Sequence, residues 1–217
     1  FEKCYFADKN DFDVVLNLSY LFLKLQDYEH SINFSNEAIK LNPKISGAFQ
    51  NLATCQLELL EFDEAKKNAK TVIELRGGLL SEEFLIYPDF ISLYADILLA
   101  KKDIEEFVNF AQKILDTKIF DGDLFGKLLK HDRNKIKPEY VQVVEKATKL
   151  LDEYKNNVEK NSNVAVAHIC LAEFHHLNDK NLSEDHYVKA NEQIASMQRG
   201  SLYSRQKLFS NLIDYFE

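Results

Sequence analysis

The chain repeats itself with a period of 34 residues. The stretch DFDVVLNLSYLFLKLQDYEHSINFSNEAIKLNP aligns with SGAFQNLATCQLELLEFDEAKKNAKTVIELRG, which begins at Ser46, and Leu18 then coincides with Leu52. A unit of this length cannot bury its apolar side chains alone. The period therefore predicts several copies of one supersecondary unit stacked side by side.

Each unit is predicted to contain two helices. Apolar residues in the first stretch follow the i, i+3, i+4, i+7 spacing of a helix face, at Leu18, Leu21, Phe22 and Leu25. Small residues recur where helices crossing ~8–10 Å apart leave no room for larger side chains. They are Ser19 and Ala53 in the first helices and Ser31 and Ala65 in the second. Asp27 and Glu61 head the second helices, where a carboxylate meets the positive end of the helix dipole.

This helix–turn–helix period resembles the tetratricopeptide repeat (TPR). The resemblance implies an all-α fold, a right-handed superhelical array of antiparallel helix pairs. We expect complete repeats over residues 12–45 and 46–79, and a looser one over 88–117 after an insertion of about eight residues. In the third repeat Phe107 takes the position of Ser31 and Ala65, so its ring must widen the helix pair or turn outward.

The N-terminal residues 1–11, FEKCYFADKND, match the last turns of a second helix, because Cys4-Tyr5 aligns with Ala38-Ile39. The first helix of that partial repeat is missing from the chain. We therefore predict a section cut from a longer solenoid, with an apolar patch at this end that frays or is covered by another chain.

The second half is less regular. We expect an irregular segment and a long helix over residues 118–160, with Pro138 at the first position of the helix. Residues 161–217 should form a degenerate TPR-like helix pair and a terminal helix. Leu171-Ala172 takes the place of the Leu-Ala pair of the second repeat.

Composition narrows the class of protein. The net charge of −8 disfavours nucleic-acid binding, and no apolar run approaches the ~18 residues of a membrane span. The N-terminus lacks the pattern of a signal peptide. Cys4, Cys55 and Cys170 show no CxxC spacing, which favours free thiols in a reducing compartment. We expect a cytoplasmic protein.

No constellation of residues indicates catalysis. The sequence lacks GxGxxG, P-loop and GxSxG motifs. His168 and His176, with Glu173 nearby and His186 on the next helix, make a metal site conceivable, but structural or solvated histidines are the favoured interpretation. The DGD stretch at 121–123 lacks further calcium ligands and indicates a turn and a helix cap. We expect no catalytic, metal-binding or cofactor-binding residue in this chain.

The TPR resemblance implies that the first helices line a groove that binds a partner. The family's inward positions fall here on Leu16, Tyr20, Leu23, Lys24, Gln50, Thr54, Leu57, Glu58, Ser92, Asp96 and Leu99. The subclass that clamps a terminal carboxylate carries Lys and Asn where this chain has Leu16, Tyr20 and Thr54, so we predict no such clamp. An extended segment with a basic end would suit a groove that is apolar at one end and polar to acidic at the other. Alternatively, some of these residues only pack against neighbouring helices.

A basic cluster lies at residues 127–137, KLLKHDRNKIK. Its cations are Lys127, Lys130, Arg133, Lys135 and Lys137. They indicate either an anion or acidic-peptide site or a solvated loop that flanks a helix.

The tail carries a second resemblance. HICLAEFHHL, DHYVKANEQIASM and LYSRQKLFSNLIDYF are similar to the closing repeat and bridging helix before the catalytic domain of TPR-containing bacterial sulfotransferases. Tyr187 and Asn191 match a Tyr/Phe-x-x-x-Asn helix of that family. The similarity covers about 50 residues, and the family's Gly-rich phosphate loop is absent from this chain.

Two functions remain open at this stage. The first is a non-catalytic TPR scaffold that binds a protein or peptide and binds neither nucleic acid nor membranes. Such a scaffold could also form a homo-oligomer. The alternative is the N-terminal helical region of a TPR-sulfotransferase-type enzyme. A strand and a Gly-rich loop encoded after Glu217 in the parent gene would favour the alternative.

Overall fold

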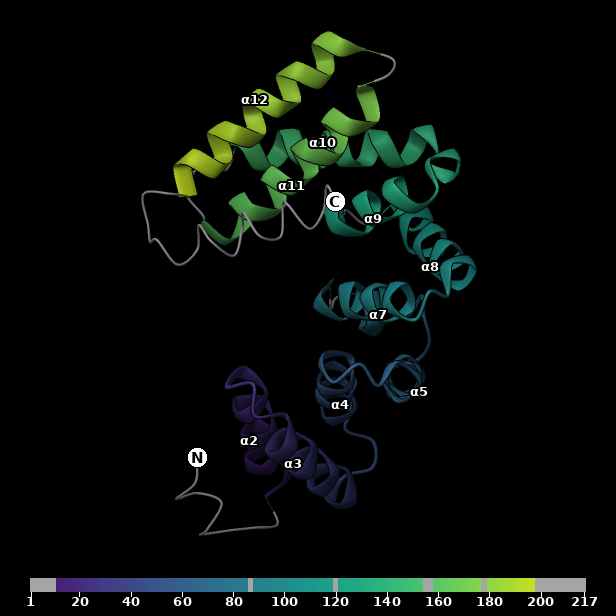
Figure 1. The fold of residues 1–217 in the computed structure, drawn as a ribbon, viewed down its shortest axis with the longest axis vertical. Coiled ribbons are helices and arrows are strands. Elements are labelled where there is room, and N and C mark those ends of the chain that lie inside the picture. The colour runs from purple at the N-terminus through teal and green to yellow at the C-terminus, as the bar shows by residue number, and fades with distance from the viewer. Residues whose placement is uncertain (1–10, 86–87, 119–120, 154–157, 177–178, 198–217) are drawn as a thin grey trace. The chain divides into compact units, whose positions relative to one another are not determined.

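The computed structural model describes residues 11–85, 88–118, 121–153, 158–176 and 179–197 (Figure 1). Within these ranges it contains eleven α-helices and no strand, which confirms the predicted all-α fold. The chain divides into two compact units, Phe1–Lys113 and Ile114–Glu217. The predicted partial repeat, apart from Asp11, and the predicted terminal helix lie outside the described residues.

Unit one consists of successive helix pairs. Its helices are α2 (Phe12–Lys24), α3 (Tyr28–Leu41), α4 (Ser46–Glu58), α5 (Phe62–Leu75), the short α6 (Glu82–Leu85), α7 (Pro88–Ala100) and α8 (Ile104–Asp116). The end of α8 belongs to unit two. Both helices of the second pair begin 34 residues after those of the first, at Ser46 after Phe12 and at Phe62 after Tyr28. The sequence period is therefore the spacing of the helix pairs.

In each pair, the turn between the two helices has a residue with a left-handed backbone conformation at the same position. Gln26, Leu60 and Lys102 have φ angles of 60°, 64° and 63°. In the first turn, Asp27 N donates to Phe22 O at 2.9 Å and Gln26 N donates to Leu23 O at 3.0 Å. This is the Schellman arrangement, in which glycine is the usual left-handed residue. Here the position is held by side chains that cost about 1 kcal/mol in that conformation.

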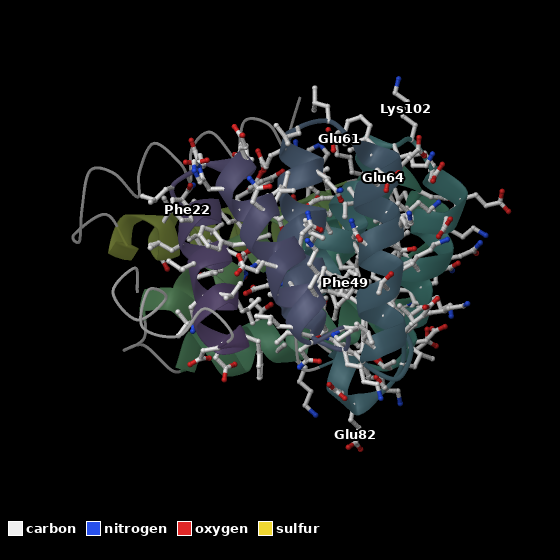
Figure 2. The ribbon with its side chains drawn as sticks, turned by 90° about the horizontal axis from the view of Figure 1, so that it is seen from below. Phe22, Phe49, Glu61, Glu64, Glu82 and Lys102 are labelled. Carbon is white, nitrogen blue, oxygen red and sulfur yellow. The ribbon has the colours of Figure 1, made fainter. Side chains whose placement is uncertain are left out.

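The second helices of the first two pairs start differently. Asp27 caps α3, because its carboxylate accepts a hydrogen bond from His30 N at 3.2 Å. Glu61 holds the same position before α5 but makes no side-chain capping bond. Figure 2 shows Glu61 and Lys102 toward one edge of the helices of unit one and Glu82 at the opposite edge. The capping role expected of both carboxylates is thus seen for Asp27 alone.

Serines line the crossing of α2 and α3. Ser19 Oγ lies 2.6 Å from Ser35 Oγ, and Ser31 Oγ donates to Ser19 O at 2.9 Å. Two residues of α4 join this network: Asn51 Nδ2 donates to Ser19 Oγ at 2.9 Å, and Cys55 Sγ donates to Ser31 Oγ at 3.2 Å. We call Ser19, Ser31 and Ser35 the serine seam. It connects the first repeat to the second through directional bonds.

Alanines occupy the equivalent positions in the second repeat. Ala53, Ala65 and Ala69 lie 34 residues after the three serines and are fully buried. We call them the alanine seam. Alanine has no hydroxyl to satisfy and allows the backbones of α4 and α5 to approach closely. At these three positions the two helices of the second repeat depend on packing, whereas elsewhere the Asn68 side chain of α5 is hydrogen-bonded to Gln56 of α4 at 2.7 Å.

The third helix pair, α7 and α8, buries a phenylalanine where the first two pairs have small residues. Phe107 is 0% exposed, so its ring does not turn outward, which was one of the two arrangements expected of it. Within the same helix pair, the rings of Tyr94 and Phe110 pack edge to face with centroids 5.0 Å apart. The insertion before this repeat forms α6, and its Phe84 packs edge-on against Phe90 of α7. The insertion thus contributes to the core.

An ion network connects α5 to α8. Lys66 Nζ lies 2.6 Å from Glu106 Oε2 and also bonds Asp103. Tyr94 OH donates to Glu106 Oε1 at 2.8 Å. Burial alone would raise the pKa of Glu106, but the bonds from Lys66, Tyr94 and Lys70 outweigh it and lower the pKa to about 2. Glu106 therefore stays ionised at neutral pH.

Unit two is built around a helical hairpin. Its elements are α9 (Gly122–His131), the 3-10 turn η1 (Arg133–Lys135), α10 (Pro138–Glu153), α11 (Val158–His175) and α12 (Lys180–Met197). α11 and α12 pack along their lengths, and α9 and α10 contact α11 (Figure 1). Phe125, Leu128 and Leu171 are fully buried in this unit. None of the helices in the described ranges is long and apolar enough to cross a membrane.

Candidate protein-binding face of unit one

The predicted groove residues lie on three helices of unit one. α2, α4 and α7 are neighbours, because α4 contacts both of the others. We call their partly or fully exposed side chains at the predicted positions the first-helix face. It comprises Tyr20, Leu23 and Lys24 of α2, Gln50, Thr54, Leu57 and Glu58 of α4, and Ser92, Asp96 and Leu99 of α7.

The α2 part of this face is an aromatic ring with a cation above it. Tyr20 is 51% exposed, which is unusual for a large ring on a helix packed into an array. Lys24 Nζ lies 5.1 Å from the centre of the Tyr20 ring. A cation over an aromatic face at this distance is attracted by the ring quadrupole. The pair offers a partner a flat apolar surface and a positive charge.

Leu16 belongs to the contact between repeats. It packs against the buried cluster of Val15, Ala38 and Ala48. A Cβ atom added at Gly47 would lie 3.4 Å from Leu16 Cδ2, so the Leu16 side chain reaches the start of α4. For this residue the geometry favours the alternative that the sequence left open, packing against a neighbouring helix.

Gln50 is held in place by a buried arginine that the sequence did not single out. Arg76 Nη2 donates to Gln50 Oε1 at 2.9 Å, and Arg76 is only 4% exposed. The guanidinium also stacks over the Phe90 ring, with 5.2 Å between its central carbon and the ring centre. Thr54 Oγ1 donates to Gln50 O at 3.0 Å. The middle of the face therefore has a fixed pattern of polar atoms.

Carboxylates dominate the far side of the face. Glu58 is exposed on α4, and Asp96 is partly buried on α7 beside Ser92 in the same helix. The face thus changes from Tyr20 and Lys24 on α2 to acidic residues on α4 and α7.

The basic cluster of residues 127–137 is largely engaged within unit two. Lys127 Nζ pairs with Asp123 at 2.6 Å, and Lys137 Nζ pairs with Asp116 at 2.6 Å. Arg133 donates to the carbonyls of Glu173 and Phe174 and lies 5.5 Å from the Phe174 ring centre. Lys130 and Lys135 are exposed. The anion site remains a prediction, and at least three of its five cations already have acceptors in the fold.

The histidines considered for a metal site and the DGD turn all lie in unit two. Asp121 caps α9 by accepting from Leu124 N at 2.9 Å, and its burial raises the pKa of its carboxyl. Among the described residues, no group of three or more His, Cys, Asp or Glu side chains has the arrangement of a metal site. His176 is exposed, whereas His175 lies beside His186. His168 and His175 are seven residues apart, so their side chains lie about 20° apart around the helix. His168 and His176 are eight residues apart, which corresponds to about 80°.

Comparison with known proteins gives this geometry a family context. A tetratricopeptide-repeat family model matches residues 12–45. The fold is similar to the crystal structure of YrrB, described as a TPR protein with an unusual peptide-binding site. The TM-score is 0.50 at 14% identity, over 95% of this chain and 97% of that one. The C-terminal part of a TPR repeat-containing protein from Cytophaga hutchinsonii matches with a TM-score of 0.46 at 18% identity, over 83% and 80% of the two chains.

The resemblance to sulfotransferase-associated helices is not among these similarities and remains a prediction. Its last segment, residues 202–216, lies outside the described residues. What is established rests on the repeat match and on the fold. The chain carries a tetratricopeptide repeat at residues 12–45 and has the all-helical fold of TPR solenoids.

Proposed function

We propose that this chain is a non-catalytic scaffold that binds a protein or peptide through the first-helix face of α2, α4 and α7. The observation that carries the proposal is the half-exposed Tyr20 with Lys24 above its ring. A large, rigid aromatic at an accessible position is the residue type that supplies most of the energy at protein interfaces. The peptide-binding site named for YrrB belongs to that protein and makes a peptide ligand a reasonable first probe.

The proposed partner is an extended segment with one apolar side chain and a basic end. The apolar side chain would pack on the Tyr20 ring. The basic end would lie near Glu58 and Asp96, where opposite charge favours the right orientation and speeds association. Gln50 offers a polar group between these two ends, held in position by Arg76.

The cellular setting is part of the same proposal. Cys55 and Cys170 are buried free thiols, which suits a reducing compartment such as the cytoplasm. The alternative, a helical region attached to a sulfotransferase-type catalytic domain, rests on sequence resemblance alone.

The test is a selection of random twelve-residue peptides on the immobilised full chain, followed by affinity measurements on the winners. We expect enrichment of peptides that combine an aromatic or leucine with a basic end. The double variant Tyr20→Ala/Asp96→Lys should bind them at least about tenfold more weakly, because it removes the ring and reverses one charge. Binding should also weaken with added salt.

A matched control separates the face from general surface effects. Leu80 is 52% exposed, and the Glu64 side chain is 57% exposed on α5. The variant Leu80→Ala/Glu64→Lys therefore makes the same two kinds of change elsewhere on unit one. It should bind like the wild type. Equal affinity of the Tyr20/Asp96 variant and the wild type, with unchanged helical circular dichroism, would show that the face is wrong.

A further inference from the structure

Three histidines of unit two come together between α11 and α12. His168 on α11 is 2% exposed, and His186 on α12 is 7% exposed. Their Nδ1 atoms are 2.9 Å apart, which is hydrogen-bond distance. The His175 ring lies 5.9 Å from that of His186, with an angle of 9° between the ring planes. We call these three residues the histidine trio.

The contact between His168 and His186 limits how many protons the pair can bind. Two Nδ1 atoms at this distance share one proton, because one ring donates and the other accepts. A second proton in the contact would set N–H against N–H and remove the hydrogen bond. With His175 also protonated, three positive rings would lie with neighbouring centroids 5.2 and 5.9 Å apart.

The charges around the trio compensate only part of that repulsion. From α10, Glu145 Oε1 lies 3.1 Å from His175 Nε2. On α12 itself, Asp185 is paired with Lys189 at 2.7 Å. From η1, which follows α9, Arg133 adds a positive charge next to Phe174. Glu145 thus pairs directly with His175, and the negative charge of Asp185 also favours protonation of His186 without cancelling the opposing effects.

The electrostatics of His186 agree with the geometry. Its pKa is lowered to about 4, first by burial and then by the charges of His168, Lys189 and His175. An exposed histidine has an ordinary value of 6.5. The closed hairpin therefore binds fewer protons than the open one between these values. Its stability is complete above about pH 6.5 and is lost as pH falls through this range.

We propose that the histidine trio is a pH-sensitive latch, which holds α11 against α12 at neutral pH and weakens progressively as pH falls below about 6.5. The latch lies entirely in unit two and does not depend on the binding function proposed for unit one. Each proton linked to opening changes the opening equilibrium by up to about tenfold per pH unit.

Hydrogen exchange of the full chain tests the latch. Amide exchange is measured by mass spectrometry at pH 7.5, 6.5 and 5.5 and corrected for the intrinsic pH dependence of exchange. Peptides from α11 and α12 should open at least about tenfold more at pH 5.5 than at pH 7.5. Peptides from α4 and α5, which contain no histidine, serve as the internal reference and should change less than about threefold. Equal changes in both sets would overturn the proposal.

Two variants identify the residues responsible. His168→Gln/His186→Gln keeps a donor and an acceptor at each position but cannot titrate, so it should lose the extra opening at low pH. His176→Gln replaces an exposed histidine next to the trio, and this variant should still show the extra opening at low pH. A double variant with the wild-type pH response would refute the latch. If that variant does not fold, NMR titration of the wild-type histidines decides, and a pKa near 6.5 for His186 refutes the proposal.

Discussion

The first two repeats share their helix spacing but differ in what fills their crossings. The serine seam of the first repeat is a hydrogen-bond network that extends into α4 through Asn51 and Cys55. The alanine seam of the second repeat has no side-chain polar atom and depends on close packing. The difference shows that the same spacing of helices can be held by two kinds of contact. In the serine seam, directional hydrogen bonds fix how the helices are aligned. In the alanine seam, the small volume of the side chains does so.

Filling the alanine seam should give the largest effect. We expect Ala65→Phe to destabilise unit one by about 3 kcal/mol, because the crossing of α4 and α5 is packed for a methyl group. The opening free energy of α4 and α5 amides in hydrogen exchange measures the loss. Glu64→Phe, on the exposed side of the same helix, should change it by less than about 0.5 kcal/mol. An equal effect of the two variants would show that the alanine seam is not tightly packed.

Removing one hydroxyl should break the serine seam. We expect Ser19→Ala to cost about 2 kcal/mol, because Asn51 Nδ2 and Ser35 Oγ each lose a buried partner. The same measurement on α2, α3 and α4 amides detects it. Asn36 is exposed next to Ser35 in α3, so Asn36→Ala is the control and should cause no loss of stability, since alanine is the better helix former. A loss below about 0.5 kcal/mol in Ser19→Ala would mean that the network adds little.

Removing both partners should convert the serine seam toward the alanine type. The double variant Ser19→Ala/Asn51→Leu should lose less stability than Ser19→Ala alone, by about 1 kcal/mol, since no amide is left unsatisfied. A double-mutant cycle with Asn51→Leu gives the coupling between the two positions. Additive losses would contradict a direct contribution from the bond between Asn51 and Ser19.

Much of this architecture was predictable, and the reasons for the gaps are physical. The coincidence of Leu18 with Leu52 predicted the helix pairs, because apolar spacing alone determines which faces are buried. The sequence marked Ser19 and Ser31 as small but gave no sign of their mutual hydrogen bonds, which depend on two helices meeting. Arg76, beside Gly77, is typical of a cation at a helix end, and nothing local indicates that it is buried against Gln50.

The left-handed turns are a feature that the two repeats share, and glycine should stabilise both. We expect Gln26→Gly and Leu60→Gly each to raise stability by about 0.5–1 kcal/mol, because glycine adopts a positive φ without steric cost. Chemical denaturation followed by circular dichroism measures the gain. Lys67→Gly, at an exposed position inside α5, should lose about 1 kcal/mol instead. A loss at Gln26 or Leu60 would show that their side chains make contacts worth more than the strain.

The smallest expected effect is a difference between the first two repeats in how their stability depends on pH. The first has His30 Nδ1 2.9 Å from the Asp27 carboxylate, whereas the second has Glu64 at the position of His30. The hydrogen bond to Asp27, followed by its charge, raises the pKa of His30 above the ordinary 6.5. The folded repeat therefore binds the proton more tightly than the unfolded chain. This contribution is complete below pH 6.5 and is lost as pH rises through the raised value.

Both partners are exposed, so the change should be slight and sensitive to salt. Corrected hydrogen exchange of α3 amides should show somewhat more opening at pH 8 than at pH 6, while α5 amides show no such trend. His30→Gln should abolish the difference between the two helices. A trend of the opposite sign in α3 would mean that other groups of the first repeat, and not this ion pair, control its response to pH.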